Sequence, residues 1–531
     1  MNGFNASATL PVLSSTALPQ AGIAEHFSTL AKTHPSRVAF YTEHRQIRFG
    51  ELYTSSLRCA SSLKELGLGY GDRCIVNTGN SIETAIAILS VWQAQAVVVL
   101  INDQSPDHHI QHAVQLTQAK VLITNKACEI SNSHCKVITE SRLCNTSDNS
   151  IATEPQSIEV NQCHAASIVF TSGSTGMPKG VTQSHKTLID ACQNLTKQLG
   201  IGVDDRILCP IPWSFDYGFG QLLSTLLAGI PQVIPVNPNP FEICRAIEQS
   251  KPTVFAGVPS LYANLLFGVS PVAETNLSSI RLLTSTGSHL PHSTRDELTR
   301  YFYNASLSLN YGLTETYRGC SLPFEHIDSN SVGKAIDGVQ IHIIRKDGTL
   351  ANASEIGEIV HCGTGTFMCY WGDEQATASC LKHCPVHGQA HDAVFTGDLG
   401  YLDERGLLYL TGRRDRIFKS MGVRISPEEI ECLLLQIDSV TEAAVIGRQH
   451  KIHGEMVISY LVSKDSSAKA LRRIREQCRM HMSPFMLPRH YCFIDSLPKT
   501  VNGKVDYPKL RLQDRQNSSG KDKSTGVSYA R

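Results

Sequence analysis

The 531-residue chain has no net charge and no long apolar run. Its 48 lysines and arginines balance 48 aspartates and glutamates, whereas a dedicated nucleic-acid or anionic-membrane binder normally carries a basic excess. The longest apolar candidate, residues 85–100, is interrupted by Gln93 and Gln95, so no stretch reaches the ~18 apolar residues that a membrane span needs. We therefore expect neither nucleic acid nor a membrane as a partner.

The sequence also lacks a secretory signal and a regular cysteine framework. Residues 1–5 have neither the positive segment nor the apolar run of a signal peptide. Seventeen cysteines are an odd number, and they are scattered along the chain. This pattern disfavours a disulfide scaffold and indicates free thiols in a reducing compartment, so we expect a cytoplasmic protein.

One cysteine and histidine cluster could bind zinc. It offers four soft or borderline ligands within twelve residues: Cys380, Cys384, His387 and His391. The same segment contains a proline and a glycine and resembles no finger with its own helix. Short motif matches of this kind are often false, so we favour a loop without metal.

The apolar fraction of 41% against 18% charged residues excludes disorder over most of the chain, and the length suggests about three or four structural units. A predicted helix at 84–94 leads into a β-branched strand at 97–101, and buried strands are predicted at 119–124 and 167–171. This alternation is typical of an α/β fold with parallel sheet.

The pattern changes near Gly412. Before it we expect short strands with turns, and after it a compact α+β unit with helices at 427–436 and 468–481 and strands at 442–446 and 456–462. The predicted organisation is a flexible leader at 1–21, a core at 22–412, a hinge at 413–415, a small domain at 416–512 and a disordered tail at 513–531.

The strongest motif follows a predicted strand and is rich in glycine and hydroxyl groups. It reads Thr171-Ser172-Gly173-Ser174-Thr175-Gly176-Met177-Pro178-Lys179-Gly180. Glycines let a backbone curl around an anion, and hydroxyls and a lysine add donors for phosphate. The spacing excludes a Walker A loop. Alone, the segment would also fit a flexible surface loop.

Four further motifs follow in a fixed order. They are Asn310-Tyr311-Gly312-Leu313-Thr314-Glu315-Thr316, Phe395-Thr396-Gly397-Asp398, Gly412-Arg413-Arg414-Asp415-Arg416-Ile417-Phe418-Lys419 and Pro498-Lys499-Thr500-Val501-Asn502-Gly503-Lys504. The first combines an aromatic ring, a hydroxyl and a carboxylate, and the second ends a predicted strand in a carboxylate. Each motif is weak singly, but the five together are highly specific.

With these motifs the chain resembles the adenylate-forming superfamily over roughly residues 22–512. This superfamily includes acyl-CoA synthetases, firefly luciferases and the adenylation domains of nonribosomal peptide synthetases. The resemblance implies a large N-terminal domain of two sheet-plus-helix subdomains and a small β-barrel-like part, followed by a small mobile α+β domain. It also implies an AMP-forming ligase that uses ATP and Mg²⁺: a carboxylate attacks the α-phosphate of ATP, and a thiol then displaces AMP.

The resemblance assigns the nucleotide to residues of the five motifs. Thr171, Ser172, Gly173, Ser174, Thr175, Gly176 and Lys179 would surround the β- and γ-phosphates. Thr314 would contact the α-phosphate, and Glu315 would hold Mg²⁺. The adenosine would contact Asn310, Tyr311, Gly312, Asp398 and Arg413, with Tyr311 stacked on adenine and Asp398 on the ribose.

Lys504 is the predicted catalytic cation for adenylation. A lysine on a long stem can bridge the substrate carboxylate and a phosphate oxygen, and the Asn502-Gly503 turn would project it. The alternative is an exposed lysine of the C-terminal region, because Lys499 and Lys509 lie nearby. Asp415 resembles the hinge position about which the small domain rotates between the half-reactions.

The acid-binding region resembles that of amino-acid-activating members. Asp216 lies among aromatic and small residues, where a carboxylate is costly without a partner, and it would pair with the α-ammonium of an amino acid. The alternative is a structural aspartate. The implied pocket residues are Asp216, Tyr217, Gly220, Ala256, Thr284, Thr286, Asn310 and Arg318.

The predicted substrate is a small amino acid. Tyr217 would narrow the floor of the pocket, and Arg318 would have to point outward or find a partner. The stretch around Asp216 also resembles stand-alone prolyl-adenylating enzymes, which makes proline the leading candidate. A fatty-acid or aryl-acid CoA ligase is the alternative.

The thiol acceptor is predicted from the length of the chain. Only 27 residues follow Lys504, too few for a fused carrier domain of ~80 residues. We therefore expect a phosphopantetheine-bearing carrier protein acting in trans, or free CoA. Four basic residues could face the CoA phosphate or an acidic carrier helix: Arg414, Arg416, Lys419 and Arg424.

Two other kinds of protein share this scaffold. A luciferase-type oxygenase would carry the same motifs, but it is a rare outcome of the fold. A catalytically inactive interaction protein would be expected to have lost Lys179, Glu315, Asp398 or Lys504, and all four are present.

Overall fold

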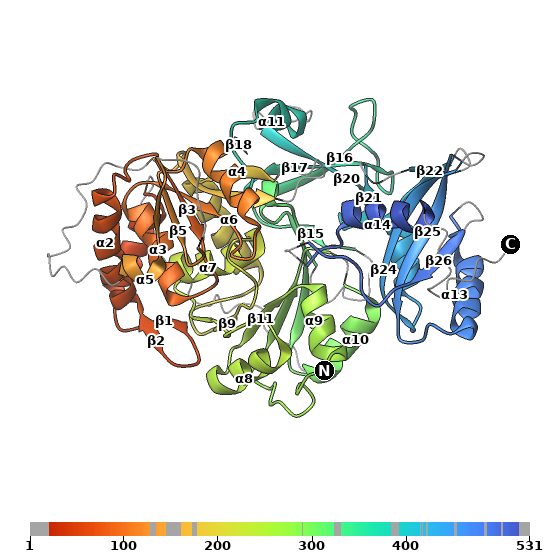
Figure 1. The fold of residues 1–531 in the computed structure, drawn as a ribbon, viewed down its shortest axis with the longest axis horizontal. Helices are drawn as coiled ribbons and strands as arrows, with labels where there is room; N and C mark the ends of the chain where they lie inside the picture. Colours follow the sequence, from red (N-terminus) through yellow and green to blue (C-terminus); the bar gives the residue numbers. More distant parts are fainter. Residues whose placement is uncertain are drawn as a thin grey trace.

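The computed structural model of the chain describes residues 21–127, 134–144, 161–171, 178–288, 290–322, 331–383, 392–414, 416, 418–420, 423–450, 454–482, 486–500 and 503–519. The first sheet and its helices lie at one end of the elongated molecule, and the C-terminal part lies at the other (Figure 1). This α/β arrangement confirms the predicted fold class.

The first sheet has seven strands in the order β18-β8-β7-β4-β3-β5-β6. Its strands are β3 (Arg73–Asn77), β4 (Val97–Leu100), β5 (Val121–Thr124), β6 (Lys136–Ile138), β7 (Ala165–Thr171), β8 (Lys179–Ser184) and β18 (Cys369–Tyr370). The centre is parallel and fully buried, as the β-branched runs of β4 and β5 predict. The helix predicted at 84–94 is α3 (Ile82–Gln93). Ser81 caps its N-terminus, because its hydroxyl accepts from the Thr84 N–H.

The second sheet has nine strands in the order β15-β14-β13-β12-β11-β9-β10-β1-β2. Its strands are β1 (Val38–Tyr41), β2 (Gln46–Arg48), β9 (Ile207–Leu208), β10 (Gln232–Val233), β11 (Val254–Gly257), β12 (Leu282–Ser285), β13 (Ser306–Tyr311), β14 (Cys320–Leu322) and β15 (Lys334–Ala335). Strands β11, β12 and β13 are parallel neighbours, so their carboxyl ends share one edge.

Helices cover both sheets. The largest core joins helices to strands of both sheets, and these helices are α1 (Ile23–Thr33), α2 (Phe49–Glu65), α3, α6 (His185–Gln198) and α7 (Asp216–Ala228). A second core lies on the other face of the second sheet, under α8 (Pro240–Ser250), α9 (Pro259–Phe267) and α10 (His292–Tyr301). The helix α4 (Asp107–Thr117) packs on the first sheet, and the short helix α5 (Glu140–Cys144) contacts α2 and α3. None of the helices in the described ranges is long and apolar enough to cross a membrane.

A smaller antiparallel sheet follows the second one. It consists of β16 (Val339–Ile344), β17 (Gly357–Gly363), β19 (Leu381–His383), β20 (Asp392–Leu402) and β21 (Leu408–Arg413), with α11 (Glu374–Cys380) beside it. Here one expectation was wrong: Asp398 does not end a strand but lies within β20. Gly397 has φ of +73°, so the backbone bends at this point while the strand continues.

The C-terminal sheet starts at Phe418, after β21 has ended at Arg413. It contains β22 (Phe418–Ser420), β23 (Val423–Ile425), β24 (Val440–His450), β25 (Gly454–Ser463) and β26 (His490–Phe493), with the helices α12 (Pro427–Leu435), α13 (Ala468–His481) and α14 (Tyr507–Ser519). Residues 513–519 are therefore helical and not part of a disordered tail, because Leu510 and Asp514 hold α14 against the sheet. The remaining domain limits and the hinge stay predictions.

Candidate active site

The predicted acid and nucleotide residues gather at the carboxyl ends of β11, β12 and β13. Ala256 and Thr284 are adjacent across β11 and β12, and the Thr286 hydroxyl donates to the Asn310 carbonyl at 2.9 Å. Carboxyl ends of parallel strands are the usual ligand-binding edge of an open α/β sheet. The fold thus brings together side chains that lie far apart in the sequence.

Tyr311, Asp398 and Arg413 form one connected group. The Tyr311 hydroxyl donates to Asp398 Oδ2 at 2.7 Å, and Arg413 Nη1 lies 3.0 Å from Asp398 Oδ1. Burial, followed by the charge of Asp398, raises the pKa of Tyr311, so its hydroxyl stays a donor. The tyrosine and the aspartate are both buried, whereas Arg413 is partly exposed.

A second group contains Lys179, Glu315 and Tyr370. The Tyr370 hydroxyl donates to Glu315 Oε1 at 2.7 Å, and Lys179 Nζ lies 5.0 Å from the centre of the Tyr370 ring. Lys179 and Thr171 are partners across β7 and β8, so they flank the glycine-rich motif. Glu315 lies in the short 3₁₀ helix η1 (Thr314–Thr316), where the Phe367 N–H donates to its carbonyl and Gln183 Nε2 donates to the Thr314 carbonyl.

Lys504 lies in a tight turn that contacts the second sheet's loops. The Gly503 N–H donates to the Thr500 carbonyl, and the Thr500 N–H donates to the Lys504 carbonyl. Gly503 adopts φ of +73°, which favours glycine. A Cβ on Gly503 would lie 3.1 Å from Ser260 Oγ, and one on Gly287 would lie 3.9 Å from Lys504 Cε. The Lys504 side chain therefore reaches the loop that follows β12.

The acid-binding residues cluster around the start of α7. Asp216 is in its first turn, and the Tyr217 hydroxyl lies 2.9 Å from the Thr284 carbonyl and 2.7 Å from its Oγ1. Gly220 faces Tyr317, since a Cβ at this position would lie only 2.5 Å from its hydroxyl. Of the two possibilities left open for Arg318, the outward orientation is excluded, because only 3% of it is exposed.

Several predicted residues lie outside the described part of the chain. These are Ser172, Gly173, Ser174, Thr175, Gly176, the hinge residue Asp415, and Cys384, His387 and His391 of the cysteine and histidine cluster. Of that cluster only Cys380 is described, at the end of α11.

Two of the basic residues considered for CoA or a carrier are engaged within the protein. Arg414 Nη1 lies 2.9 Å from Glu358 Oε2. Arg416 is half-buried between Glu428 and Glu431, at 2.6 and 2.7 Å, and its guanidinium stacks 3.7 Å from the Tyr507 ring centre. Arg416 therefore holds the C-terminal domain together and does not face a ligand.

Sequence reasoning missed Tyr370 and Tyr317. Tyr370 comes from β18, and no spacing relates it to Glu315, some 55 residues earlier. Tyr317 lies directly after a quoted motif, but its left-handed backbone, with φ of +55°, left no signal in the sequence. Both contacts depend on tertiary packing.

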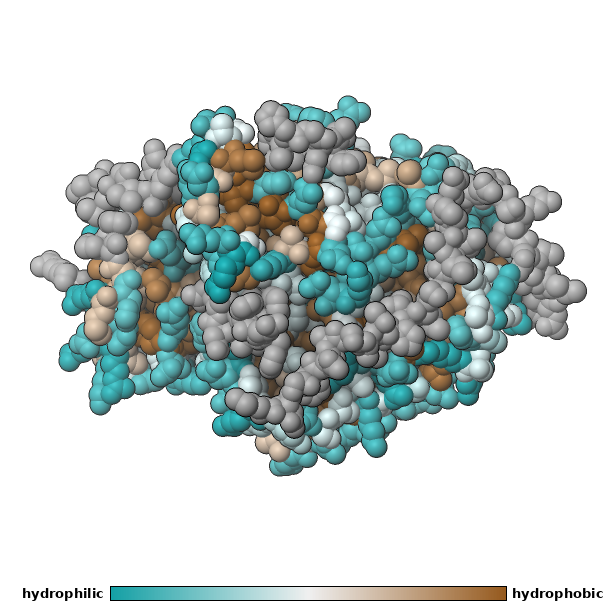
Figure 2. Space-filling view, turned by 180° about the vertical axis from the view of Figure 1, so that it is seen from behind, coloured by the Kyte–Doolittle hydropathy of each residue, from teal (hydrophilic) through white to brown (hydrophobic). Residues whose placement is uncertain are grey.

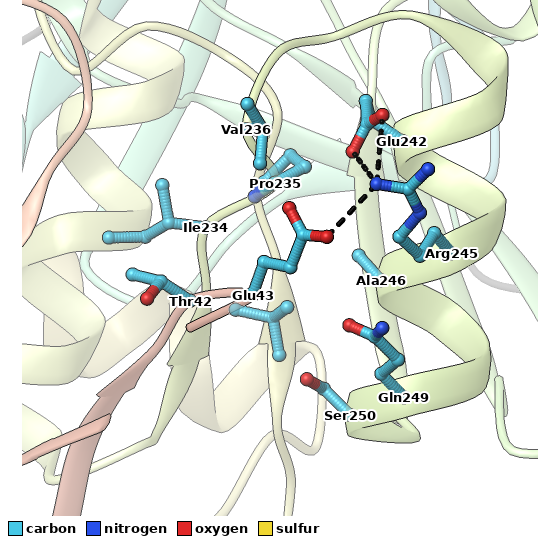
Figure 3. Close-up of a pocket in the computed structure, with 11 residues that line it drawn as sticks. Thr42, Glu43, Ile234, Pro235, Val236, Glu242, Arg245, Ala246, Gln249 and Ser250 are labelled. Carbon is cyan, nitrogen blue, oxygen red and sulfur yellow. Dashed lines mark hydrogen bonds and ion pairs between the residues drawn. The ribbon is translucent and has the colours of Figure 1, made fainter. Parts of the chain in front are cut away.

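A small pocket elsewhere has no part in this site. It lies between β1, β10 and α8, where Glu43 and Glu242 hold Arg245 (Figure 3). Its volume of about 10 Å³ leaves room for little more than one water molecule.

The fold and this site define a class of enzyme, and comparisons with known proteins support it. The AMP-binding enzyme family matches residues 27–371, and the AMP-binding enzyme C-terminal domain matches residues 429–504. The chain belongs to this family of AMP-forming ligases, as the five motifs predict.

Individual proteins are similar to the chain at less than 30% sequence identity. The chain is 28% identical to 2-succinylbenzoate–CoA ligase of Bacillus licheniformis, over 90% of this chain and 98% of that protein. It is also 27% identical to tyrocidine synthase 1 of Brevibacillus parabrevis, over 92% of this chain but only 44% of that protein. The structure of o-succinylbenzoate CoA synthetase of Bacillus subtilis, with ATP and magnesium, matches with a TM-score of 0.80 and 26% identity, over 92% of this chain and 99% of that one.

Proposed function

We propose that this protein adenylates a carboxylic acid with ATP and Mg²⁺ and then transfers the acyl group to a thiol. An oxygen of the acid attacks the α-phosphorus, and the bond to the β-phosphate breaks, which releases pyrophosphate. The thiol sulfur then attacks the acyl carbon, and AMP leaves. The observation that carries this proposal is the approach of Lys504, from the C-terminal domain, to the loop after β12 beside the predicted acid and nucleotide residues.

The nucleotide would be held by the two connected groups. Asp398 and Arg413 would bind the ribose, and Tyr311 would stack on adenine. Lys179, with Thr171 and the hydroxyls of the glycine-rich motif, would neutralise the phosphates. Charge neutralisation of this kind is the main requirement of phosphoryl chemistry.

The residues around η1 fit a magnesium ion. Mg²⁺ prefers a few hard oxygen ligands together with phosphate oxygens. The Glu315 carboxylate and the Thr314 hydroxyl supply such oxygens, and the Tyr370 hydroxyl fixes one carboxylate oxygen at 2.7 Å. Bound there, the ion would add positive charge beside the phosphates.

An amino acid is the proposed substrate, with proline the candidate suggested by the sequence. Asp216 supports an amino acid because it begins α7 next to Tyr217, whose hydroxyl contacts Thr284, and no cation of the described residues is paired to Asp216. A carrier protein in trans is the proposed acceptor. The engagement of Arg414 and Arg416 with glutamates leaves fewer cations for a CoA phosphate.

An AMP-forming acyl-CoA ligase is the alternative. The relative named 2-succinylbenzoate–CoA ligase is matched over 98% of its length, which keeps CoA as a candidate acceptor. Both alternatives share the first half-reaction.

Pyrophosphate exchange tests the proposal. The protein is assayed with all proteinogenic amino acids and with short and long fatty acids. We expect exchange with an amino acid; exchange with fatty acids alone would overturn the role of Asp216, and exchange with no acid would contradict adenylation. Thioester formation with CoA or with a phosphopantetheinylated carrier then identifies the acceptor.

A further inference from the structure

Arg318 is a buried cation beside the start of α7. It lies between η1 and β14, and only 3% of it is exposed. Its Nη2 donates to the Tyr217 carbonyl at 3.3 Å. Its guanidinium carbon lies 4.5 Å from the Tyr217 ring centre and 5.1 Å from that of Tyr317. Two aromatic rings thus hold the guanidinium in place.

The charge of Arg318 has no anionic partner among the described residues. Its Nε and Nη1 reach no hydrogen-bond acceptor, and none of the ion pairs between described side chains includes it. The ionisable neighbours are neutral, because burial raises the pKa of Cys192, Cys209 and Tyr217 to about 12. A buried guanidinium without a counter-charge is strongly unfavourable.

Two other polar side chains of the same β13–β14 segment also lack hydrogen-bond partners. Asn310 is 8% exposed, and neither its side-chain oxygen nor its nitrogen has a partner. The buried Tyr317 hydroxyl likewise forms no hydrogen bond of suitable geometry, although it lies beside the Arg318 guanidinium. Three polar side chains from the β13–β14 segment are therefore short of partners, which indicates a ligand with polar atoms.

Helix α7 packs closely against this group at Gly220. Gly220 faces it, and a Cβ there would lie 2.5 Å from the Tyr317 hydroxyl and 3.1 Å from Arg318 Nη1. Asp216 is one helical turn earlier, so it shares the Gly220 face of α7. Its charge acts on the Tyr317 hydroxyl, as does that of Arg318.

We propose that Arg318 binds a second carboxylate of the substrate, so that the activated acid is a dicarboxylic acid. This inference rests on the proposed adenylation. One carboxylate reacts with ATP near Lys504, and the other receives hydrogen bonds from Arg318, with the Asn310 amide beside it. An α-ammonium on the same molecule would meet Asp216, so the class includes acidic amino acids as well as simple dicarboxylic acids.

A neutral substrate fits this site less well. The ring of proline or an alkyl tail would leave the guanidinium buried and unpaired. A site built around a buried polar group rejects an analogue that lacks the matching group by a large factor. The geometry around Arg318 therefore favours a dicarboxylic acid over proline.

Pyrophosphate exchange with matched acids tests the inference. The panel contains L-aspartate and L-glutamate, succinate and glutarate, the neutral partners L-2-aminobutyrate and butyrate, and L-proline. We expect kcat/KM for at least one dicarboxylic acid to exceed that of every neutral acid by about 100-fold or more. The amino and plain dicarboxylic acids distinguish the two members of the class.

The variant Arg318→Met keeps much of the side-chain volume without the charge. We expect it to lose about 100-fold in kcat/KM for the dicarboxylic acid and to lose less for the neutral acids, a change of selectivity that a merely structural role would not produce. Arg300→Met is the matched control, because Arg300 is an exposed residue of α10. This control should keep the wild-type preference.

A preference of the wild-type protein for proline or another neutral acid would overturn the inference, whether or not the variant folds. An unchanged preference in Arg318→Met would also overturn it. Exchange with no acid at all would instead refute the adenylation itself, and the two failures are thus distinguishable.

Discussion

Replacing Tyr370 by phenylalanine removes one hydroxyl from the candidate magnesium site. That hydroxyl donates to Glu315 Oε1 at 2.7 Å, and burial together with the Glu315 charge raises the pKa of Tyr370, so it remains a donor at every working pH. The phenylalanine keeps the ring over which Lys179 Nζ lies at 5.0 Å. The substitution therefore isolates the hydrogen bond from the cation–π contact.

The expected effect follows from the strength of that bond. A hydrogen bond to a charged group contributes about 1.5–3 kcal/mol, and every 1.4 kcal/mol corresponds to a factor of about ten. If the bond orients Glu315 for Mg²⁺ and ATP, kcat/KM for Mg-ATP falls by roughly 10- to 150-fold. Tyr370→Leu also removes the ring, and the loss of the cation–π contact adds about 0.5–2 kcal/mol.

Pyrophosphate exchange at varied Mg-ATP measures both variants. Tyr303→Phe serves as a control, because Tyr303 is 72% exposed, in the loop between α10 and β13. A Tyr370→Phe enzyme with wild-type kcat/KM for Mg-ATP would refute the role given to this hydrogen bond.

Two further predictions concern Asp398 and His361. Asp398→Asn keeps the shape but removes the charge that pairs with Arg413 and accepts from Tyr311; we expect the KM for ATP to rise by about tenfold or more, and an unchanged KM in the exchange assay would exclude a ribose contact. His361 is buried, its Nε2–H donates to the Thr364 carbonyl at 2.9 Å, and burial lowers its pKa from 6.5 to about 4. Between these values the unfolded chain binds a proton that the folded protein does not, so the free energy of unfolding decreases as the pH falls from 6.5 to 4, by roughly 3 kcal/mol for this residue. Urea denaturation across this pH range measures the free energy of unfolding of the wild-type protein and of His361→Gln. We expect this free energy to decrease less in His361→Gln, and equal pH slopes in the two proteins would contradict the assignment.

Local patterns predicted most of the fold. The strand β4 and the amphipathic helix α13 (Ala468–His481) agree closely with the prediction from the sequence. A strand buried on both faces has a continuous apolar run, and a helix buried on one face has apolar residues at helical spacing. The tail assignment failed for residues 513–519, since polar composition hid the contact of Asp514 with Arg448 and Tyr460. Polar residues can order a helix through long-range pairs that no local pattern records.

The candidate site was only partly predictable. Motifs predicted roles for Glu315, Asp398 and Lys504, and these roles stay predictions. They gave no hint that Tyr370 would bind Glu315, or that Arg318 would be buried without a counter-charge among the described residues. Such features arise when segments distant in sequence pack together, so no local pattern records them.

One face of the molecule is mostly hydrophilic. In the view from behind, hydrophilic side chains cover most of the visible face, and hydrophobic ones appear mainly in its upper middle (Figure 2). The chemistry thus depends on local clusters of charge, since the chain as a whole carries none.

The most direct test of the account separates the two half-reactions in Lys504→Ala. We expect pyrophosphate exchange to fall by about 100- to 1,000-fold, whereas thioester formation from supplied acyl-adenylate stays at the wild-type rate. Lys509→Ala, which alters an exposed lysine of α14, should leave both activities intact. Wild-type exchange in Lys504→Ala would contradict the claim that this lysine brings the acid and the triphosphate together.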